Sequence, residues 1–129
     1  MKQTISLNKN ELFLRVYKKG KRSYHKDFIL YYLPNGLPHN RLGIKAGKKL
    51  ASAVGRNRVR RLLKESYRLL EPEIKTGYDL IFAAKYSCLT ADSLAETMGA
   101  MRHLLKYARL FVVSKDSSSP EAEEWEPKL

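Results

Sequence analysis

One stretch decides how this chain folds: residues 54–70, VGRNRVRRLLKESYRLL. Its apolar residues recur at helical spacing and Pro72 blocks continuation, so the pattern predicts an α-helix over residues 54–70. At ~100° per residue, the apolar side chains gather on one side and the basic ones on the opposite arc. The predicted core side holds Val59, Leu62, Leu63, Ser66, Leu69 and Leu70. The predicted outer arc holds Arg56, Asn57, Arg60, Arg61, Lys64 and Arg68.

The basic arc belongs to a strongly charged region. Residues 41–68 contain ten basic residues and a single acid, Glu65, which gives a net charge of +9. Like charges four residues apart destabilise a helix by about 0.2–0.5 kcal/mol per pair, and a face that served only solubility would mix both signs. Phosphates would turn this repulsion into affinity through charge-assisted hydrogen bonds and counterion release. The pattern therefore favours a nucleic-acid contact over a merely solvated face.

The composition of the whole chain agrees with a polyanionic partner. Its 129 residues include 25 basic and 13 acidic side chains, a formal net charge of +12. The longest apolar run, residues 28–33, is far shorter than the ~20 residues of a membrane span, and no apolar stretch follows Met1 as in a signal peptide. Cys88 is the only cysteine, which excludes an internal disulfide and a thiolate-rich metal site. We expect a cytoplasmic protein that binds nucleic acid, with no membrane partner and no small-molecule substrate.

The charge divides the chain into two parts. Residues 1–113 carry a net charge of +15 and are predicted to form the nucleic-acid-binding domain. Residues 114–129 contain five acids and two lysines, a net charge of −3, and are rich in serine without apolar periodicity, which predicts a disordered acidic tail. Trp125 in this tail is either a docking residue or incidental, and the composition of the tail favours the second.

The residues before the basic stretch predict one helix and two strands. Asn8 and Glu11 have the spacing of a capping box and a glycine follows Lys19, so we expect a helix over residues 9–19. Residues 26–33 are rich in aromatic and branched side chains and end at a Pro-Asn-Gly turn, which predicts a strand. The alternation in residues 41–46 predicts a second strand. It carries Leu42, Ile44 and Ala46 on one face and Arg41 and Lys45 on the other.

The residues after the basic stretch predict a strand and a last helix. Residues 78–84 follow the Gly77 turn and form an apolar run typical of a buried strand. Thr90 or Asp92 can cap the last helix. The whole order predicts an α+β fold, a small mixed sheet of about four strands with three helices. The apolar residues expected on the last helix are Leu94, Met98, Met101, Leu105 and Ala108.

The basic helix and several motifs on either side of it, taken in their order along the chain, resemble the bacterial ribonuclease P protein family. Arg-Asn-Arg alone would be a weak motif, whereas the same motif in this order and spacing is specific. The resemblance extends over residues 7–108. It is carried by Arg56-Asn57-Arg58 with their flanks, Arg41-Leu42-Gly43-Ile44, Lys48-Lys49, Phe13, Tyr17, residues 28–33, Gly77-Tyr78-Asp79-Leu80 and Leu104-Leu105-Lys106.

The resemblance implies both a fold and a function. The basic helix would cross between parallel strands with left-handed connectivity, an exception to the usual hand. The protein would bind the catalytic RNA of ribonuclease P and contact the 5′ leader of precursor tRNA in a cleft between the sheet and the first helix. Cleavage at the mature 5′ end would be carried out by the RNA with Mg²⁺, so the protein would be a subunit of an endoribonuclease without catalytic residues or metal ligands of its own.

The resemblance also implies which residues bind RNA. Aromatic rings suit the single-stranded leader because every base offers a face for stacking. Ordinary core packing is the alternative for these rings, and strand alternation puts Tyr31 opposite Phe28, Leu30 and Tyr32 without saying which set faces the main core. The leader-binding positions are Phe13, Tyr17 and Tyr31. The positions for the catalytic RNA are Arg56, Asn57, Arg58, Arg60, Arg61, Lys64 and Arg68, extended by Lys45, Lys48 and Lys49.

Two other functions stay open at this point. A stand-alone RNA-binding or ribosome-associated protein would use the same basic helix. An autonomous endonuclease would need clustered carboxylates to hold a metal ion. Outside the tail only Glu71 and Glu73 are close in sequence, and His25, His39 and His103 are far apart. The sequence therefore favours the ribozyme subunit.

Overall fold

The computed structural model describes residues 4–47, 52–85 and 93–112. Several sequence-based predictions concern residues outside these ranges and stay predictions. They are those on Lys48, Lys49, Cys88 and the acidic tail with Trp125.

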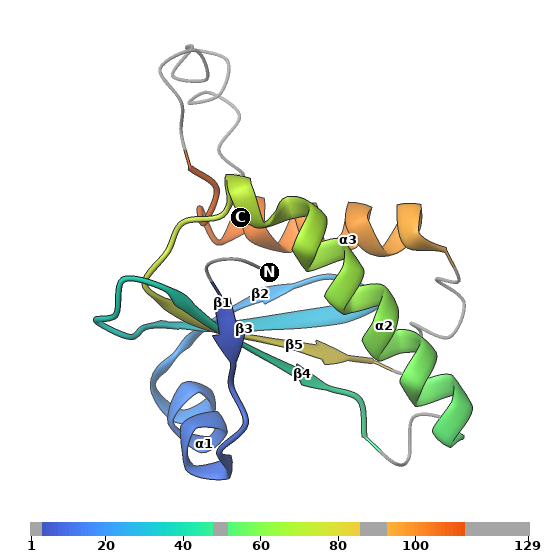
Figure 1. The fold of residues 1–129 in the computed structure, drawn as a ribbon, viewed down its shortest axis with the longest axis horizontal. Helices are drawn as coiled ribbons and strands as arrows, with labels where there is room; N and C mark the ends of the chain where they lie inside the picture. The colour runs from blue at the N-terminus through green and yellow to red at the C-terminus, as the bar shows by residue number, and fades with distance from the viewer. Residues whose placement is uncertain (1–3, 48–51, 86–92, 113–129) are drawn as a thin grey trace.

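A mixed sheet of five strands forms the middle of the molecule (Figure 1). In space the strands follow the order β1-β4-β5-β3-β2. The pairs β1–β4 and β4–β5 are parallel, and the pairs β3–β5 and β2–β3 are antiparallel. β5 is therefore the central strand, paired with β4 on one side and β3 on the other. The strands are β1 (Thr4–Ser6), β2 (Lys21–Tyr24), β3 (Phe28–Pro34), β4 (Asn40–Lys45) and β5 (Tyr78–Ala84).

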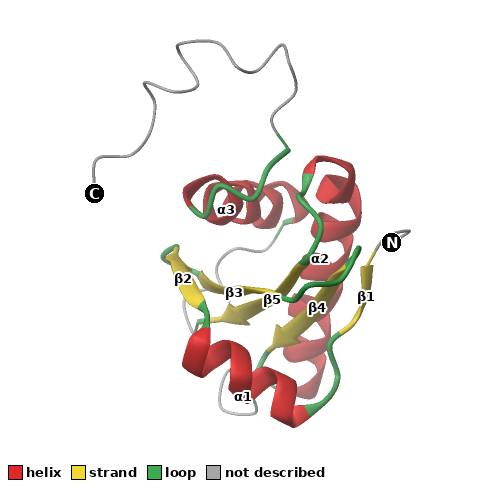
Figure 2. Cartoon of the chain, turned by 90° about the vertical axis from the view of Figure 1, so that its left-hand side faces the viewer, coloured by secondary structure: helices red, strands yellow, loops and turns green. Residues whose placement is uncertain are grey.

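Three helices cover the two faces of the sheet (Figure 2). The first, α1 (Asn10–Lys19), lies on one face, and α2 (Ala53–Leu70) and α3 (Leu94–Tyr107) lie on the other. α2, continued by the short 3₁₀ helix η1 (Glu71–Glu73), connects the parallel neighbours β4 and β5. Figures 1 and 2 together show that this crossover is left-handed, as the resemblance implies. In the described part of the chain, no helix has the length and apolar character that crossing a membrane requires.

The two faces of the sheet carry cores of different size. The larger core fills the space between the sheet and the pair α2 and α3, with Leu30, Leu80 and Phe82 from the strands fully buried. The smaller core lies between α1 and the sheet and contains three buried residues, Val16, Leu7 and Ile81. Five half-buried residues pack around this smaller core: Leu12, Phe13, Tyr17, Tyr31 and Leu33.

Side-chain alternation along β3 and β4 assigns their residues to these two faces. Phe28, Leu30 and Tyr32 pack in the larger core, whereas Tyr31 packs against the smaller one. Strand alternation left open which side of β3 faces the main core. The structure shows that Phe28, Leu30 and Tyr32 face it and that Tyr31 faces α1. Along β4 and the residue that follows it, the predicted inner face is confirmed, since all its members belong to the larger core or pack against it: Leu42, Ile44 and Ala46.

The α+β class and the three helices are confirmed, but the sheet has five strands rather than about four. Sequence reasoning missed β1 and β2, which are short and whose buried residues are polar. Thr4 shares a hydrogen bond of 2.9 Å with the hydroxyl of Tyr67, and Ser23 donates one of 2.9 Å to the carbonyl of Leu104. These strands are fixed by such bonds and by main-chain pairing, so hydrophobic alternation does not mark them.

The helix boundaries differ slightly from those predicted. α1 begins at Asn10 after Lys9, which makes no side-chain cap, so the predicted capping box at Asn8 and Glu11 is wrong. The amide of Leu7 donates to the carbonyl of Leu42 at 2.8 Å, which keeps the chain extended past β1 and delays the helix. α2 and α3 begin after the serine caps Ser52 and Ser93, so the predicted cap of the last helix at Thr90 or Asp92 is wrong.

The buried side of α2 is rotated slightly from the predicted one. Tyr67 is fully buried, whereas Leu69 is 42% exposed and Leu62 is half-buried. Tyr67 takes the buried place predicted for Leu69 because its hydroxyl has polar partners on other elements. Besides the bond with Thr4, the hydroxyl accepts a hydrogen bond of 3.2 Å from Asn40. The Asn40 amide bonds onward to the carbonyl of Lys75 and the N–H of Tyr78. A tyrosine can be buried here because its hydroxyl is satisfied.

Candidate nucleic-acid interface

The first turns of α2 concentrate positive charge. Ser52 caps the helix by accepting the N–H of Gly55 at 3.2 Å, and the first turn contains no acid. The N–H groups of a helix start carry partial positive charge, and Arg56 and Arg58 follow within the next turn. An anion that approaches this end meets both the helix pole and the guanidinium groups.

Along the rest of α2 the basic side chains face outward. Arg60 is held against the fold: it donates to the carbonyl of Ala46 at 3.4 Å and approaches the side-chain oxygen of Asn57 at 3.5 Å. Because the opposite side of α2 is locked into the larger core, the charges form an array whose spacing is set by the helix. The exposed members are Asn57, Arg58, Arg61, Lys64 and Arg68, and the half-buried ones are Arg56 and Arg60.

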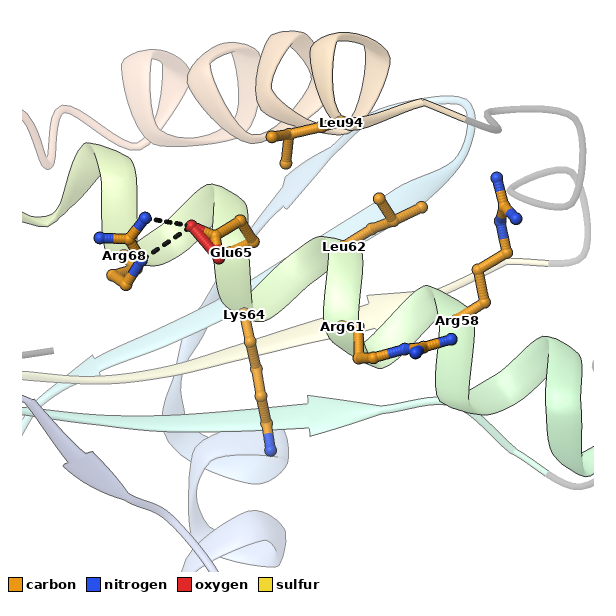
Figure 3. A pocket seen from close by; sticks show the side chains of 7 residues that line it. All are labelled: Arg58, Arg61, Leu62, Lys64, Glu65, Arg68 and Leu94. Carbon is orange, nitrogen blue, oxygen red and sulfur yellow. Dashed lines mark hydrogen bonds and ion pairs between the residues drawn. The ribbon is translucent and has the colours of Figure 1, made fainter.

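Two shallow grooves run along this basic side. The α2–α3 groove has a volume of about 590 Å³, and in Figure 3 Leu62 of α2 and Leu94 of α3 both extend into the space between the two helices. A second groove of about 400 Å³ lies on the other side of Arg61 and Lys64, which line both. The α2–α3 groove is lined by Arg58, Arg61, Leu62, Lys64, Glu65, Arg68 and Leu94. The second groove is lined by Val54, Asn57, Arg60, Arg61 and Lys64.

The one acid of the basic region is paired at an end of the α2–α3 groove. Glu65 accepts a hydrogen bond of 2.7 Å from Nε of Arg68 and a second, shorter one from Nη2. This hydrogen bonding, and then the charge of Glu65, raise the pKa of the Arg68 guanidinium. Glu65 therefore offsets its neighbour Arg68 and leaves the positive charge concentrated toward Arg58 and Arg61 (Figure 3).

Lys45 does not lie with the basic array of α2. Its strand neighbours Ile44 and Ala46 pack toward the larger core, so alternation places the exposed Lys45 on the α1 face of the sheet. The structure thus separates Lys45 from the α2 residues with which the sequence grouped it.

The three predicted leader-binding residues come together on the α1 face. The rings of Tyr17 and Tyr31 meet edge to face with centroids 4.7 Å apart, and Phe13 lies 6.3 Å from Tyr17. All three are half-buried, so each keeps part of its ring open to solvent. Burial, and then the neighbouring Tyr31, raise the pKa of the Tyr17 phenol.

Phe13 also serves the packing of the fold. A Cβ atom added to Gly43 of β4 would lie 2.6 Å from Cζ of Phe13. The ring therefore rests directly on the backbone of β4, in a place that only glycine leaves free. Phe13 therefore packs against the smaller core and is also a wall of the site.

Sequence reasoning missed Arg22 as a member of this aromatic site. Its guanidinium carbon lies 5.2 Å from the centre of the Tyr31 ring, within the range of a cation–π contact. A hydrogen bond with Tyr24, and then the electrostatic interaction with the same side chain, raise the pKa of Arg22. The signal was the basic dipeptide Lys21-Arg22, whose strand was not recognised. We name Phe13, Tyr17, Tyr31 and Arg22 the α1 site.

The buried carboxylate of Asp79 is occupied by structural partners. It takes a bidentate ion pair with Arg41, at 2.7 and 2.8 Å, and a further hydrogen bond of 3.1 Å from Asn35. This cluster ties β4 to β5 and to the turn after β3. A carboxylate held in this way is not available as a base or a metal ligand.

Folding brings two histidines together that are distant in sequence. The rings of His25 and His103 have centroids 5.4 Å apart, and His103 lies 4.4 Å from Tyr107. Burial lowers the pKa of His25, and the nearby His103 lowers it further, against an opposite effect of Asp27. Among the described residues, no group of three or more His, Cys, Asp and Glu side chains is placed to hold a metal ion.

Comparison with known proteins places these features in a family. Residues 1–109 match the family model for ribonuclease P. A ribonuclease P protein component of Alkaliphilus oremlandii is 47% identical over 110 residues, which cover 85% of this chain and 96% of that protein. One of Thermoanaerobacter pseudethanolicus is 40% identical over 110 residues, covering 85% and 94%.

Solved structures agree with the sequence comparison. A Staphylococcus aureus RNase P protein mutant with defective mRNA degradation activity superposes with a TM-score of 0.76 and 32% identity, over 82% of this chain and 89% of that one. The RNase P protein of Thermotoga maritima gives a TM-score of 0.72 and 25% identity, over 77% and 95%.

Proposed function

The chain belongs to the ribonuclease P protein family, whose members are components of an endoribonuclease that processes tRNA, and on that premise we propose that it binds two RNAs with two faces. The basic array of α2 would bind the catalytic RNA of ribonuclease P. The α1 site would bind the single-stranded 5′ leader of precursor tRNA. The cytoplasmic location expected from the sequence belongs to the same proposal.

The observation that carries the proposal is the one-sided charge of α2. From Arg56 to Arg68 the outer side holds six basic side chains and Asn57, and Glu65 is the only acid. Each phosphate neutralised by such a residue releases counterions, which gives RNA affinity a steep dependence on salt. Arginine adds planar, bidentate contacts to phosphate.

The α1 site supports the leader contact by its chemistry. Tyr17 and Tyr31 each keep part of a ring open, and a base of any identity can stack on such a ring. Arg22 beside Tyr31 supplies a positive charge for the adjoining phosphate. A leader differs between precursors, so a site that accepts every base suits a substrate of variable sequence.

The chemical step is assigned to the RNA component, with Mg²⁺ as its metal. Within the described residues, no acidic or histidine cluster suited to a divalent cation supports a site on the protein. The buried Asp79, which could have been a ligand, is engaged by Arg41. The protein's own part is to position RNA and offset its charge, which lowers the repulsion between the two RNAs.

The experiment that tests this proposal compares three reactions on precursor tRNA: protein alone, catalytic RNA alone, and both. We expect no cleavage by protein alone at any Mg²⁺ concentration, and we expect the protein to lower the Mg²⁺ concentration that the catalytic RNA requires. Specific cleavage by RNase-treated protein would overturn the proposal. An mRNA is tested in parallel because one structural relative is described in terms of mRNA degradation. Recovery of mixed ribosomal RNA, rather than one structured RNA, on the purified protein would favour the ribosome-associated alternative.

A further inference from the structure

The described chain leaves the fold beside the basic helix. The amide of Val112 donates to the carbonyl of Glu73 at 2.7 Å, and Phe111 pairs with Ile74. Val112, the last described residue, therefore lies at η1, which directly follows α2. The nearer end of the α2–α3 groove, at Arg68, lies only about 8 Å from Glu73 along the helix axis, at 1.5 Å per residue.

The α2–α3 groove combines basic and apolar side chains, and a phosphate group would contact only the basic ones. Four basic side chains and one acid line it, a net charge of +3, and its apolar lining residues, which we name its floor, are Leu62 and Leu94. A phosphate would occupy the basic rim but gain nothing from the apolar floor. The complementary occupant is a segment with carboxylates around one apolar side chain.

The chain itself contains such a segment. Residues 121–126 read Glu-Ala-Glu-Glu-Trp-Glu and contain the only tryptophan of the sequence. We propose that residues 121–126 dock in the α2–α3 groove, with Trp125 on Leu62 and Leu94 and the glutamates among Arg58, Arg61 and Arg68, and thereby compete with RNA for α2. This inference rests on the proposed function of α2. It concerns a segment beyond residues 1–109, which the family model matches.

The length of the connection fits this contact. Trp125 follows Val112 by thirteen residues, and a flexible chain of that length has a root-mean-square span of about 20 Å. Leu62 lies eleven residues before Glu73, about 17 Å along the helix axis. When span and distance match in this way, the effective concentration of the segment is on the order of millimolar. A contact of only millimolar affinity is then substantially populated.

Competition from the docked segment would lower the affinity of α2 for RNA. If the segment binds with a dissociation constant of about 0.1–1 mM, it weakens RNA binding by about two- to ten-fold, as expected for competition at millimolar effective concentration. An RNA that contacts the whole basic array displaces the segment readily. An RNA with few phosphate contacts does not. The segment would therefore restrict α2 to RNAs that engage all of it.

The docking can be tested without RNA, because emission of Trp125 reports on this segment alone. In the full chain at about 50 mM salt, where charges are little screened, we expect blue-shifted emission and protection from acrylamide. Raising salt to about 1 M, where the Debye length is about 3 Å, should remove both. Leu94→Ser should do the same by removing the floor. Arg15→Glu, an exposed basic position on α1 across the sheet, is the matched control and should change nothing.

A second measurement separates docking from general repulsion between the acidic segment and RNA. Trp125→Ser keeps every charge of the segment but removes its anchor, so docking predicts about two- to ten-fold tighter RNA binding, the same factor as above. Pure repulsion predicts no change for Trp125→Ser and a gain in RNA affinity that grows with the number of glutamates replaced by glutamine, at Glu121, Glu123, Glu124 and Glu126. Added catalytic RNA should shift the Trp125 emission to that of an exposed indole.

Three results would overturn the proposal. The first is a Trp125 emission that is that of an exposed indole in the full chain and is equal in all variants. The second is an emission shift that grows with protein concentration, because that would place the segment on a second copy of the chain. The third is an RNA affinity that Trp125→Ser leaves unchanged. The first two involve no RNA. These two results would therefore overturn the docking proposal without overturning the proposed function. The proposed function fails if α2 binds no catalytic RNA after the segment is removed.

Discussion

On the α2 and α3 face of the sheet, packing and function belong to different side chains. Leu63 and Tyr67 are buried in the larger core, while Arg61 and Lys64 on the same helix are exposed. On the α1 face the two roles fall on the same side chains. Tyr17 and Tyr31 pack against the smaller core and also form the open wall of the α1 site. Substitutions should therefore separate affinity from stability on the first face and combine them on the second.

The ion pairs on the two faces should give the largest contrast. Arg41→Met leaves the buried Asp79 carboxylate without its bidentate partner, and losing one member of a buried pair costs about 3–5 kcal/mol of unfolding free energy. On α2, Glu65→Gln breaks an exposed pair, and we expect no measurable change in stability. Urea unfolding of both variants tests this. Equal destabilisation would mean that the two pairs do not differ in role.

The aromatic side chains should give the next largest effect. Tyr17→Ala and Tyr31→Ala each remove a stacking surface worth about 1–3 kcal/mol, so binding of precursor tRNA to the holoenzyme should weaken about five- to a hundred-fold. Binding of mature tRNA, which has no leader, should hardly change. Both variants should also lose stability because the rings pack on the smaller core.

The matched control for this experiment is Tyr32→Ala. Tyr32 is the next residue on β3 but faces the larger core, so its loss should lower the melting temperature without selective weakening of leader binding. If Tyr32→Ala weakens precursor binding as selectively as Tyr31→Ala, the leader does not bind on the α1 face.

The basic array should show the opposite separation. Arg61→Ala with Lys64→Ala removes two exposed charges, and the slope of log K against log salt for the catalytic RNA should flatten by about 1.4–1.8. The melting temperature should stay the same, since neither side chain is buried. Arg60 is a poorer choice because it bonds to Ala46. Removing Arg15 and Lys18 from α1 is the control. An equal change of slope there would show that charge alone, and not its place on α2, determines binding.

The smallest effect concerns His25, which lies between β2 and β3 beside His103 of α3. Because burial lowers its pKa in the folded protein, its contribution to stability is present above its unfolded pKa of about 6.5 and is lost as the pH falls through the lower folded value. The melting temperature should decrease slightly from pH 7 to pH 5. His25→Gln should reduce that decrease, and an unchanged pH dependence in this variant would contradict the assignment.

The parts of the fold that sequence predicted are those with apolar periodicity. α2, β3, β4 and β5 each carry enough apolar side chains to reveal their period. β1 and β2 do not, because Thr4 and Ser23 are held by hydrogen bonds to Tyr67 and Leu104 in other elements. Such partners lie more than sixty residues away, and no local pattern contains them.

The site was predictable to a similar degree. The basic arc of α2 follows from helical spacing alone, and the resemblance supplied the aromatic residues. The face of Tyr31, the separation of Lys45 from the array and the presence of Arg22 beside Tyr31 required the arrangement of the sheet. Each of these three features depends on which helix covers which face of the sheet. Strand alternation separates the two faces but does not say which helix covers either one.

The position of β5 has a consequence for the synthesis of the protein. It is the last strand to be made, yet it lies at the centre of the sheet. Until residues 78–84 have emerged from the ribosome, the nascent chain can form only two separate ribbons, β1 with β4 and β2 with β3, and two-stranded ribbons are marginal in water. β5 joins them in one late step, which also gives α2 a surface on which to pack. We therefore expect an interrupted translation product that ends before β5 to be a strongly basic chain with exposed apolar side chains, which proteases would degrade.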